Sequence, residues 1–244
     1  MNNITTINDH YSLRTICNNS LKDFSFPEGD FNPDGNWTSS YKVMTLTGQG
    51  WPLGKLKIKR ICKENGRINL VMHYQLFLKG GYRQDITGQI ECVNNSLSSP
   101  AFWKFNSLIL TPSKQPQPFT KQTKTAKISN GKMQIVSSGK KSIKIPNENY
   151  TTNWLLFDAV QRLPKDQTTP ITFAMLDHFD QIKKDQKLTF RTNTVIKYKD
   201  KDHQLYAYQQ VGTAVTPVVY WVNNQGRLLF VISGFEAYIL ENDE

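Results

Sequence analysis

Alternation of apolar and polar residues along the C-terminal stretch 215–240 constrains the fold more than any other feature of this sequence. Short apolar runs there are interrupted by Asn224-Gln225-Gly226-Arg227 and again by Ser233-Gly234. Side chains along a strand alternate between the two faces of a sheet, and glycine supplies the positive φ of tight turns, so this pattern predicts antiparallel strands joined by hairpins. The pattern recurs back to Tyr41, which makes the predicted fold mainly β.

Strands of this kind are predicted on both sides of a single helix. Leu56 and Ile58 alternate strictly with three lysines, and the turn signal Glu64-Asn65-Gly66 closes a long hairpin over 53–78. The remaining strands are predicted at 85–93 and 102–110, weakly within 121–145, and then at 171–176, 188–199, 204–211, 215–222, 228–232 and 235–240.

The segment 153–163 is predicted to be the helix. Asn153 is a suitable cap, the apolar residues that follow do not repeat every second position, and Pro164 ends the segment. Together with the strands this predicts an antiparallel curved sheet or open half-barrel with one short helix, and two stacked β-subdomains are the alternative.

The N-terminal part has a different composition. Residues 1–40 are rich in polar side chains, proline and glycine, which predicts a loosely ordered arm held to the body by Phe24, Phe26, Phe31 and Trp37. Residues 41–244 are predicted to form a single β-rich domain, with a subdivision near 112–150 as the alternative.

The chain is basic, and its charge is unevenly distributed. Its 244 residues are 38% hydrophobic, enough for a large core, and the formal net charge is +10. Between Glu91 and Glu148 the sequence has nine lysines and no acidic residue. This excess favours contact with anionic surfaces or polymers.

Cysteine content and apolar run lengths leave several points open. Cys17, Cys62 and Cys92 are too few and too far apart for a disulfide framework or a zinc site, although a Cys62–Cys92 pair stays open. No run reaches the roughly 20 apolar residues of a membrane span. Without a leader the sequence as given predicts a cytoplasmic protein, and a removed leader would place it in the periplasm or envelope. No cofactor or metal is predicted, and the oligomeric state is left open.

Candidate catalytic residues are sparse. His178 lies between Asp177 and Asp180, a pattern that suits either a polar turn at a strand end or a general base oriented by a carboxylate. The turn is the favoured interpretation, and a hydrolytic enzyme is the alternative. His73 is expected in mid-strand, and the glycines between Gly48 and Gly54 precede a strand, so they predict a wide turn and not a phosphate loop.

A basic face is predicted on the long hairpin, formed by Lys55, Lys57, Lys59 and Arg67. A solvated surface is favoured over contact with an anionic surface. Nucleic acid is an improbable partner, because base stacking needs aromatic side chains interleaved with the basic ones, and lysine lacks the bidentate fork of arginine.

Two segments resemble an uncharacterised family of bacterial envelope proteins, a domain-of-unknown-function group with a β half-barrel fold. Gly50-Trp51-Pro52-Leu53-Gly54, which leads into an alternating strand, is similar to the early Gly-x-Pro-x-Gly turn of that family. Trp221-Val222, followed by Gly226-Arg227, is similar to its late hairpin. The resemblance implies a half-barrel whose form is like that of periplasmic lipoprotein carriers, and it implies no catalytic residues.

The resulting hypothesis is a non-catalytic protein that binds an apolar or lipid-like ligand, or an envelope component, on its concave face. The alternatives are a filled core with no ligand, the hydrolytic enzyme, and a scaffold that binds anionic polymer through lysines. The residues expected to line the concave face are Leu56, Ile58, Leu70, Met72, Tyr74, Phe190 and Trp221.

Overall fold

The computed structural model describes residues 4–7, 13, 16, 18–21, 23–47, 49–137, 139–145, 149–166, 169–177 and 181–241. One continuous, strongly curved sheet takes in every strand of this part of the chain. The strands are β1 Ile4–Ile7, β2 Trp37–Thr45, β3 Pro52–Cys62, β4 Ile68–Phe77, β5 Arg83–Cys92, β6 Pro100–Leu110, β7 Gln122–Ser129, β8 Lys132–Val136, β9 Lys140–Lys144, β10 Tyr150–Thr152, β11 Ile171–Asp177, β12 Gln181–Tyr198, β13 Lys201–Val211, β14 Val218–Asn223, β15 Leu228–Ser233 and β16 Glu236–Glu241.

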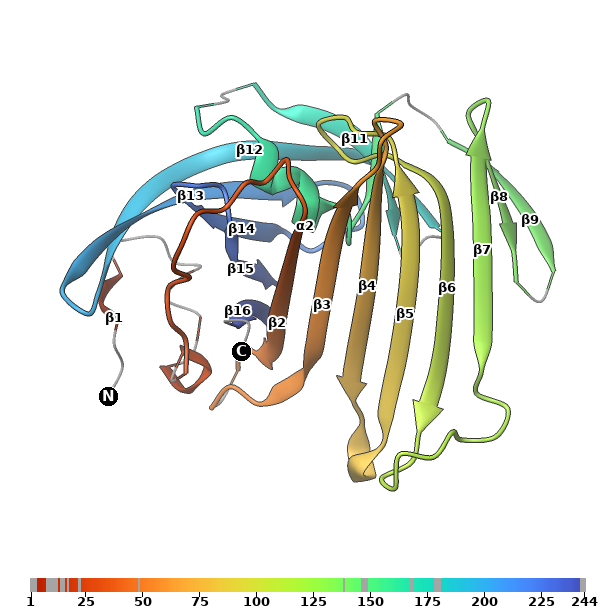
Figure 1. The fold of residues 1–244 in the computed structure, drawn as a ribbon, viewed down its shortest axis with the longest axis horizontal. Coiled ribbons are helices and arrows are strands. Elements are labelled where there is room, and N and C mark those ends of the chain that lie inside the picture. Colours follow the sequence, from red (N-terminus) through yellow and green to blue (C-terminus); the bar gives the residue numbers. More distant parts are fainter. Residues whose placement is uncertain are drawn as a thin grey trace.

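The strand order is β10-β11-β12-β13-β14-β15-β16-β2-β3-β4-β5-β6-β7-β8-β9, with β1 pairing beside β12. In Figure 1, β2–β7 form one long wall, and β12 and β13 arch across the top of the molecule. All neighbouring strands along this path are antiparallel except β10 and β11, which are parallel. The predicted curved antiparallel sheet is confirmed, and the alternative of two stacked subdomains is wrong.

The predicted turns are set by local backbone chemistry. Gly66 and Gly226 have φ of 76° and 88°, values that a residue with a Cβ rarely adopts. Lys199 and Asp200 join β12 to β13 with φ of 46° and 62°, as a two-residue hairpin of the primed type requires. These turns fix the register on either side, so the side-chain alternation read from the sequence survives in the sheet.

Four strands differ from the sequence-based prediction. Strand β1 and the start of β2 at Trp37 lie inside the segment expected to be a loose arm, and β12 begins at Gln181, seven residues before the predicted start. Strand β10 was not predicted because three residues carry too little periodicity to detect. The first residues of β2 pair with β3 and with the C-terminal strand β16, whereas the early start of β12 comes from its antiparallel pairing with the preceding strand β11, where Asp177 lies opposite Gln181.

The helix is shorter than predicted and has a different cap. It consists of α2, Leu156–Ala159, followed by the 3-10 turn η3, Val160–Arg162. Asn153 does not cap it. The Leu155 N–H donates to the Thr152 hydroxyl at 3.1 Å, because Thr152 ends β10 immediately before the chain turns.

Hydrogen bonds between β10 and the β5–β6 loop connect the β10 end of the sheet to the wall. The Thr151 hydroxyl donates to the Leu97 carbonyl at 2.7 Å, and the Ser99 hydroxyl donates to the Tyr150 carbonyl at 2.6 Å. Strand β10 thereby returns to the start of β6, while β7–β9 continue outward as a separate wing, visible at the right of Figure 1. The result is a half-barrel with a covered upper end.

A buried ion pair fixes the helix inside this curve. Arg60 and Asp158 are both inaccessible to solvent, and Arg60 Nε lies 2.9 Å from Asp158 Oδ1. Asp158 Oδ2 also contacts Arg162 Nη2 at 3.1 Å and accepts a hydrogen bond from the Ser98 hydroxyl. Arg60 Nη1 donates to the carbonyls of Asp34 and Gly35. These contacts tie together β3, the β5–β6 loop, the helix and the segment before β2.

The segment before β2 covers the opposite, outer face of the sheet. Phe24 and Phe26 are buried, and the Tyr198 hydroxyl donates to the Phe24 carbonyl at 3.1 Å. The Phe24 ring lies 4.8 Å from that of Phe230, centroid to centroid. Trp37 is also buried, whereas Phe31 is only partly buried against the core.

Replacement of Asp158 by Asn is expected to destabilise the fold by about 3–5 kcal/mol, because it leaves two buried guanidinium groups without their carboxylate. Urea unfolding measures this change. The matched control is Glu241→Gln, which removes the carboxylate of the exposed Lys55–Glu241 pair and should cost about 1 kcal/mol or less. Equal losses in the two variants would contradict the assigned role of Asp158.

Candidate functional site

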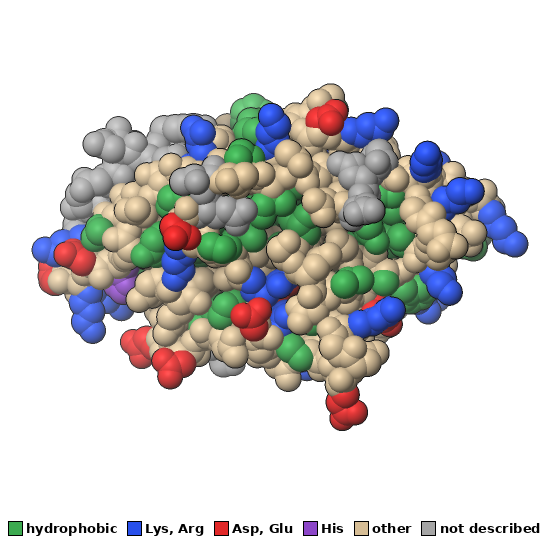
Figure 2. Space-filling model, turned by 90° about the horizontal axis from the view of Figure 1, so that it is seen from above, with side chains coloured by type: hydrophobic (Ala, Val, Ile, Leu, Met, Phe, Trp, Pro, Cys, Tyr) green, Lys and Arg blue, Asp and Glu red, His purple; other side chains and the backbone are tan. Residues whose placement is uncertain are grey.

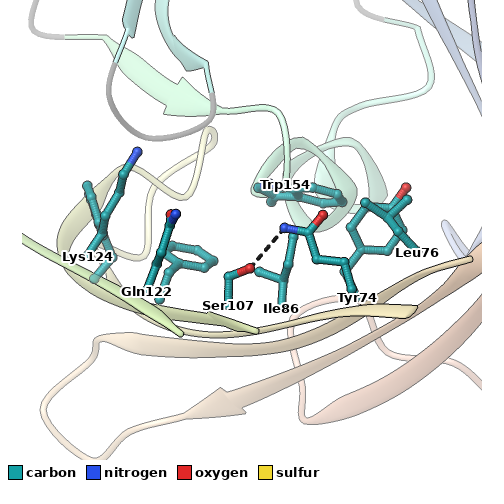
Figure 3. Close-up of a pocket in the computed structure, with 10 residues that line it drawn as sticks. Tyr74, Leu76, Ile86, Ser107, Gln122, Lys124 and Trp154 are labelled. Carbon is teal, nitrogen blue, oxygen red and sulfur yellow. Dashed lines mark hydrogen bonds between the residues drawn. The ribbon is translucent and has the colours of Figure 1, made fainter. Parts of the chain in front are cut away.

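A cavity of about 350 Å³ lies on the inner face of the sheet, between β4–β7 and the start of the helical segment. Figure 3 shows Tyr74, Leu76 and Ile86 on the sheet with Trp154 on the other side. Its volume falls near the lower end of the roughly 300–1,000 Å³ of small-molecule sites. The lining residues are Tyr74, Leu76, Gln84, Ile86, Trp103, Phe105, Ser107, Gln122, Lys124 and Trp154.

Alternation along the strands brings these side chains to one face. The register places Phe105 beside both Gly88 and Lys124, and Ile86 beside both Tyr74 and Ser107. Residues directly opposite in an antiparallel pair share a face, so the lining forms continuous rows across four strands. Gln84 lies opposite Ile109 of β6. Along β6 the cavity therefore extends from Trp103 to the level of Ile109, a length of six residues or about 20 Å.

Gly88 makes room for one wall of the cavity. A Cβ at this position would lie 2.2 Å from Phe105 Cε1 and 2.7 Å from Met72 Cγ. The Phe105 ring therefore lies across the glycine, where any side chain would displace it. A glycine inside a strand often marks such a close approach.

The helical segment supplies the opposite wall. The Trp154 ring lies 5.1 Å from that of Tyr74, and Phe157 packs against Tyr238 at 5.3 Å, centroid to centroid. Phe157 also contacts Tyr41 at 5.5 Å in an edge-to-face arrangement. Because Asp158 is adjacent to Phe157, the buried ion pair and this aromatic cluster together fix Trp154 over the sheet.

Polar groups occupy one side of the cavity. The Gln84 amide donates to the Ser107 hydroxyl at 2.9 Å, the bond drawn as a dashed line in Figure 3. Gln122 and Lys124 come from β7, and Lys124 is the one charged side chain among the lining residues. The cavity thus combines an aromatic and aliphatic interior with amide, hydroxyl and ammonium groups along its margin.

Burial sets the ionisation of the tyrosine at the centre of this site. Removal from water raises the pKa of Tyr74 to about 12, and it also raises the pKa of Tyr238, to which Tyr74 is hydrogen-bonded. Both phenols are therefore neutral at ordinary pH and serve as uncharged hydrogen-bonding groups. The described residues of the lining are aromatic, aliphatic, amide, hydroxyl and ammonium side chains, with no His, Cys, Asp or Glu among them, and this chemistry suits binding.

The residues expected to line the concave face have different positions. Tyr74 lines the cavity, whereas Leu56, Ile58, Leu70 and Met72 share its face but are buried in the core. Phe190 lies on the same inner face and is partly buried against Tyr208, at a ring distance of 5.7 Å. Trp221 is in register with Phe230 on the outer face, because the alternation along β14 points Tyr220, its neighbour, inward.

The expected basic face is on the outside of the sheet. Lys55, Lys57 and Lys59 are exposed along β3, while Arg67 lies in the turn before β4. Lys55 pairs with Glu241 at 3.4 Å, and Arg67 pairs with Glu91. The lysine-rich stretch is elsewhere: in Figure 2, Lys and Arg side chains gather at the right-hand end, over the β7–β9 wing.

The other candidate residues do not form a site within the described chain. His178 and Asp180 lie outside the described residues, and Asp177 pairs with Lys183 at 2.6 Å. His73 Nε2 lies 3.8 Å from Asp85 on the outer face. No group of three metal-binding side chains occurs in the part of the chain that the structure covers.

The two cysteines in the described chain are unpaired. Cys62 and Cys92 each lie opposite Ile68, on strands that flank β4, so two inter-strand spacings, or about 9–10 Å, separate them. That separation exceeds the reach of a disulfide. Burial, followed by the nearby Asp158 carboxylate, raises the pKa of the Cys92 thiol well above its usual value.

Sequence reasoning missed most of the cavity. Trp103 and Phe105 occupy alternate positions of β6, and Gly88 lies in the neighbouring strand, a combination that signals a ring packed over a backbone gap. Lys124 was grouped with the other lysines of its stretch. Its position opposite Phe105 is what places it on the inner face.

Comparisons with known proteins identify the fold and nothing finer. No protein-family model matches the sequence, and no curated protein matches it either. Among solved structures, the chain is similar to a β-barrel-like protein of domain of unknown function DUF1849 from Brucella abortus, with a TM-score of 0.59 and 9% sequence identity. The match covers 85% of this chain and 96% of that one. At this identity the likeness shows the fold alone, which is that of a barrel-like β protein. In the described residues, no helix has the length and apolarity needed to cross a membrane.

Stability should fall at high pH in a way that depends on Tyr74. A phenol whose pKa is about 12 when folded and about 10 when unfolded stabilises the native state fully below pH 10, and this contribution is lost as pH rises towards 12. We expect the free energy of unfolding of Tyr74→Phe to decline less steeply over that window, by at most about 1.4 kcal/mol per pH unit. Urea unfolding at pH 9, 10 and 11 measures the slope, and identical slopes in the two proteins would contradict the assignment.

Proposed function

We propose that this protein is a non-catalytic binding protein for a small amphiphile, with the apolar part of the ligand in the cavity and an anionic or hydrogen-bonding group at its polar margin. The observation that carries the proposal is the cavity itself, half enclosed between the sheet and Trp154. At about 30 Å³ per water-sized group, 350 Å³ accommodates about a dozen methylene-sized groups. That size suits a short acyl or aromatic moiety.

The composition of the walls supports an apolar ligand. Trp154 and Phe105 supply flat ring surfaces, and Ile86 and Leu76 supply aliphatic surface. These four side chains are only partly buried in the protein alone, so a ligand would remove further apolar surface from water. Tyr74 contributes a neutral phenol beside them.

The position of Lys124 supports a ligand with an anionic group. Its ammonium lies at the β7 side of the cavity, next to the Gln122 amide. An anion at that margin would gain charge-assisted hydrogen bonds while the apolar part stays between Trp154 and the sheet. A neutral ligand of the same shape would gain only the apolar contacts.

The barrel-like neighbour supports the scaffold and leaves the ligand open. Its curved sheet is shared over most of both chains. The resemblance to the half-barrel family of bacterial envelope proteins, through Gly50–Gly54 and the Trp221 hairpin, fits the same scaffold, and we propose a lipid-like compound of the cell envelope as the natural ligand class.

The binding test uses two fluorescent probes with the same ring system: neutral N-phenyl-1-naphthylamine and anionic 1-anilinonaphthalene-8-sulfonate. Both should bind saturably with one site per chain. Ser107→Trp places an indole in the cavity and should abolish binding of both. Asn106→Trp, one residue away on the outer face of β6, is the matched control and should bind like the wild type. Non-saturable binding, or the same loss in both variants, would refute the cavity as the site.

The role of Lys124 is tested with the same probes. Lys124→Gln should weaken binding of the anionic probe about 3- to 10-fold, since one charge-assisted hydrogen bond is lost, and should leave the neutral probe unchanged. Lys127→Gln is the control, because Lys127 is exposed on the other face of β7. If Lys124→Gln weakens both probes equally, the ammonium acts on the shape of the cavity and not on ligand charge.

A further inference from the structure

One end of the sheet, the lower end of β2–β7 in Figure 1, exposes a concentration of large hydrophobic side chains. Among the described residues, six of the eleven exposed large hydrophobic side chains lie there. Phe119 is fully exposed, Phe235 is 76% exposed and Trp51 is 65% exposed. The six are Trp51, Phe77, Leu78, Tyr82, Phe119 and Phe235, and we refer to them as the apolar rim.

The register shows that these residues share one end. Strand β2 ends and β3 begins there, with Met44 opposite Pro52. Strand β4 ends where β5 begins, with Phe77 opposite Arg83, and Arg83 in turn faces Leu110 at the end of β6. Five of the six rim residues therefore lie on or beside the turns β2–β3, β4–β5 and β6–β7, and Phe235 lies on the turn β15–β16.

Direct contacts join neighbouring turns of the rim. The Leu46 N–H donates to the Phe235 carbonyl at 2.6 Å, which places the β15–β16 turn beside the β2–β3 turn. A Cβ on Gly81 would lie 3.4 Å from the Pro112 ring, which places the β4–β5 turn beside the β6–β7 turn. From β2 to β7 the rim extends across five inter-strand spacings, or about 24 Å.

The charge on three of these turns has one sign, while Glu236 follows Phe235 on the fourth. The segments 46–51, 78–82 and 111–121 contain Lys79, Lys114 and Lys121 and no Asp or Glu. All three lysines are exposed. Exposed aromatic side chains flanked by lysines are the composition of protein segments that rest at the interface of an anionic membrane, where rings enter the headgroup region and ammonium groups meet phosphates.

We infer that the apolar rim docks on the surface of an anionic lipid bilayer. Its hydrophobic side chains stand on separate turns with glycine, proline and polar residues between them, so they offer projecting groups and not a flat contiguous patch. A fluid headgroup layer can admit such projections individually. Protein interfaces instead need a continuous complementary surface, and arginine is enriched in them whereas lysine is depleted.

The rim also adjoins the cavity. Leu76 and Gln84 line the cavity, and Leu76 directly precedes Phe77 along β4 while Gln84 directly follows Arg83 along β5. Docking would therefore bring the lower end of the cavity close to the lipid headgroups. Docking of the apolar rim on a bilayer does not require a ligand in the cavity.

Vesicle flotation tests the inference, with phosphatidylcholine vesicles compared with vesicles of phosphatidylcholine and phosphatidylglycerol at a 7:3 ratio. The protein should float with the anionic vesicles and be released by 0.5 M salt. Lys79→Gln, Lys114→Gln and Lys121→Gln combined should weaken this binding on the order of a hundredfold. The matched control replaces Lys132, Lys140 and Lys144 of the β7–β9 wing by Gln and should bind within a few-fold of the wild type.

The apolar contribution is tested with Leu78→Ser, Phe119→Ser and Phe235→Ser combined, which should weaken binding by about tenfold or more. The control combines Val93→Ser, Phe102→Ser and Val195→Ser, exposed residues away from the rim, and should have little effect. Circular dichroism confirms that each variant is folded. Equal loss in both sets, or no flotation by the wild type, would overturn the inference, as would self-association that the rim substitutions abolish without any vesicle binding.

Trp51 reports insertion independently of affinity. It is exposed, whereas Trp37, Trp103 and Trp221 are buried and Trp154 is partly buried over the cavity. Brominated lipids should quench part of the tryptophan emission in wild type and none in Trp51→Phe. Ser107→Trp should still float with anionic vesicles, so failure of the cavity proposal and failure of the rim are separable. Quenching that persists in Trp51→Phe would place the contact elsewhere.

Discussion

The interior of this half-barrel depends on one buried carboxylate. Asp158 meets the guanidinium groups of Arg60 and Arg162 and the Ser98 hydroxyl, and these contacts hold a helical segment of seven residues inside the curved sheet. A charge this deeply buried is tolerated only when its partners are in place, which makes the position of the helix specific. The carbonyls of Asp34 and Gly35 extend the same network to the chain before β2.

The cavity follows from that placement. Trp154 precedes the first turn of the helical segment and Phe157 lies within it, and their rings meet Tyr74 and Tyr238 on the sheet. On the sheet, the Phe105 ring packs against the backbone at Gly88, where there is no Cβ. A cavity therefore remains between this part of the sheet and Trp154. Core residues such as Leu56 and Met72 pack fully only a short distance away. The same inner face therefore changes from closed core to open site along its length.

The two ends of the sheet have opposite character. The upper end holds the ionic network and the hydrogen bonds from Thr151 and Ser99 that bring β10 back to β6. The lower end exposes the apolar rim and its lysines. Satisfied polar groups make the upper end rigid. The exposed aromatic side chains of the lower end suit it to contact with another surface.

Several features were predictable from local sequence. The hairpins at Gly66 and Gly226 follow from glycine's access to positive φ, and the strict alternation at Leu56 and Ile58 fixed which face of β3 is buried. The same alternation continues to Arg60, a charged residue on the buried face, and Asp158 lies among apolar helix residues. Read together, those two exceptions could have indicated the ion pair. The assignment of Trp221 to the inner face went wrong because both faces of β14 are buried there, so its apolar residues do not alternate with polar ones.

The sequence by itself determined that this chain forms antiparallel strands with tight turns and one short helix, because those outcomes depend on side-chain alternation and on the φ preferences of a few residues. Only the tertiary structure decided which strands close the curve, where the helix sits, and that part of the inner face stays hollow. Such features arise from contacts between residues far apart in the chain, as between Arg60 and Asp158 or Thr151 and Leu97, and no local pattern encodes those pairings.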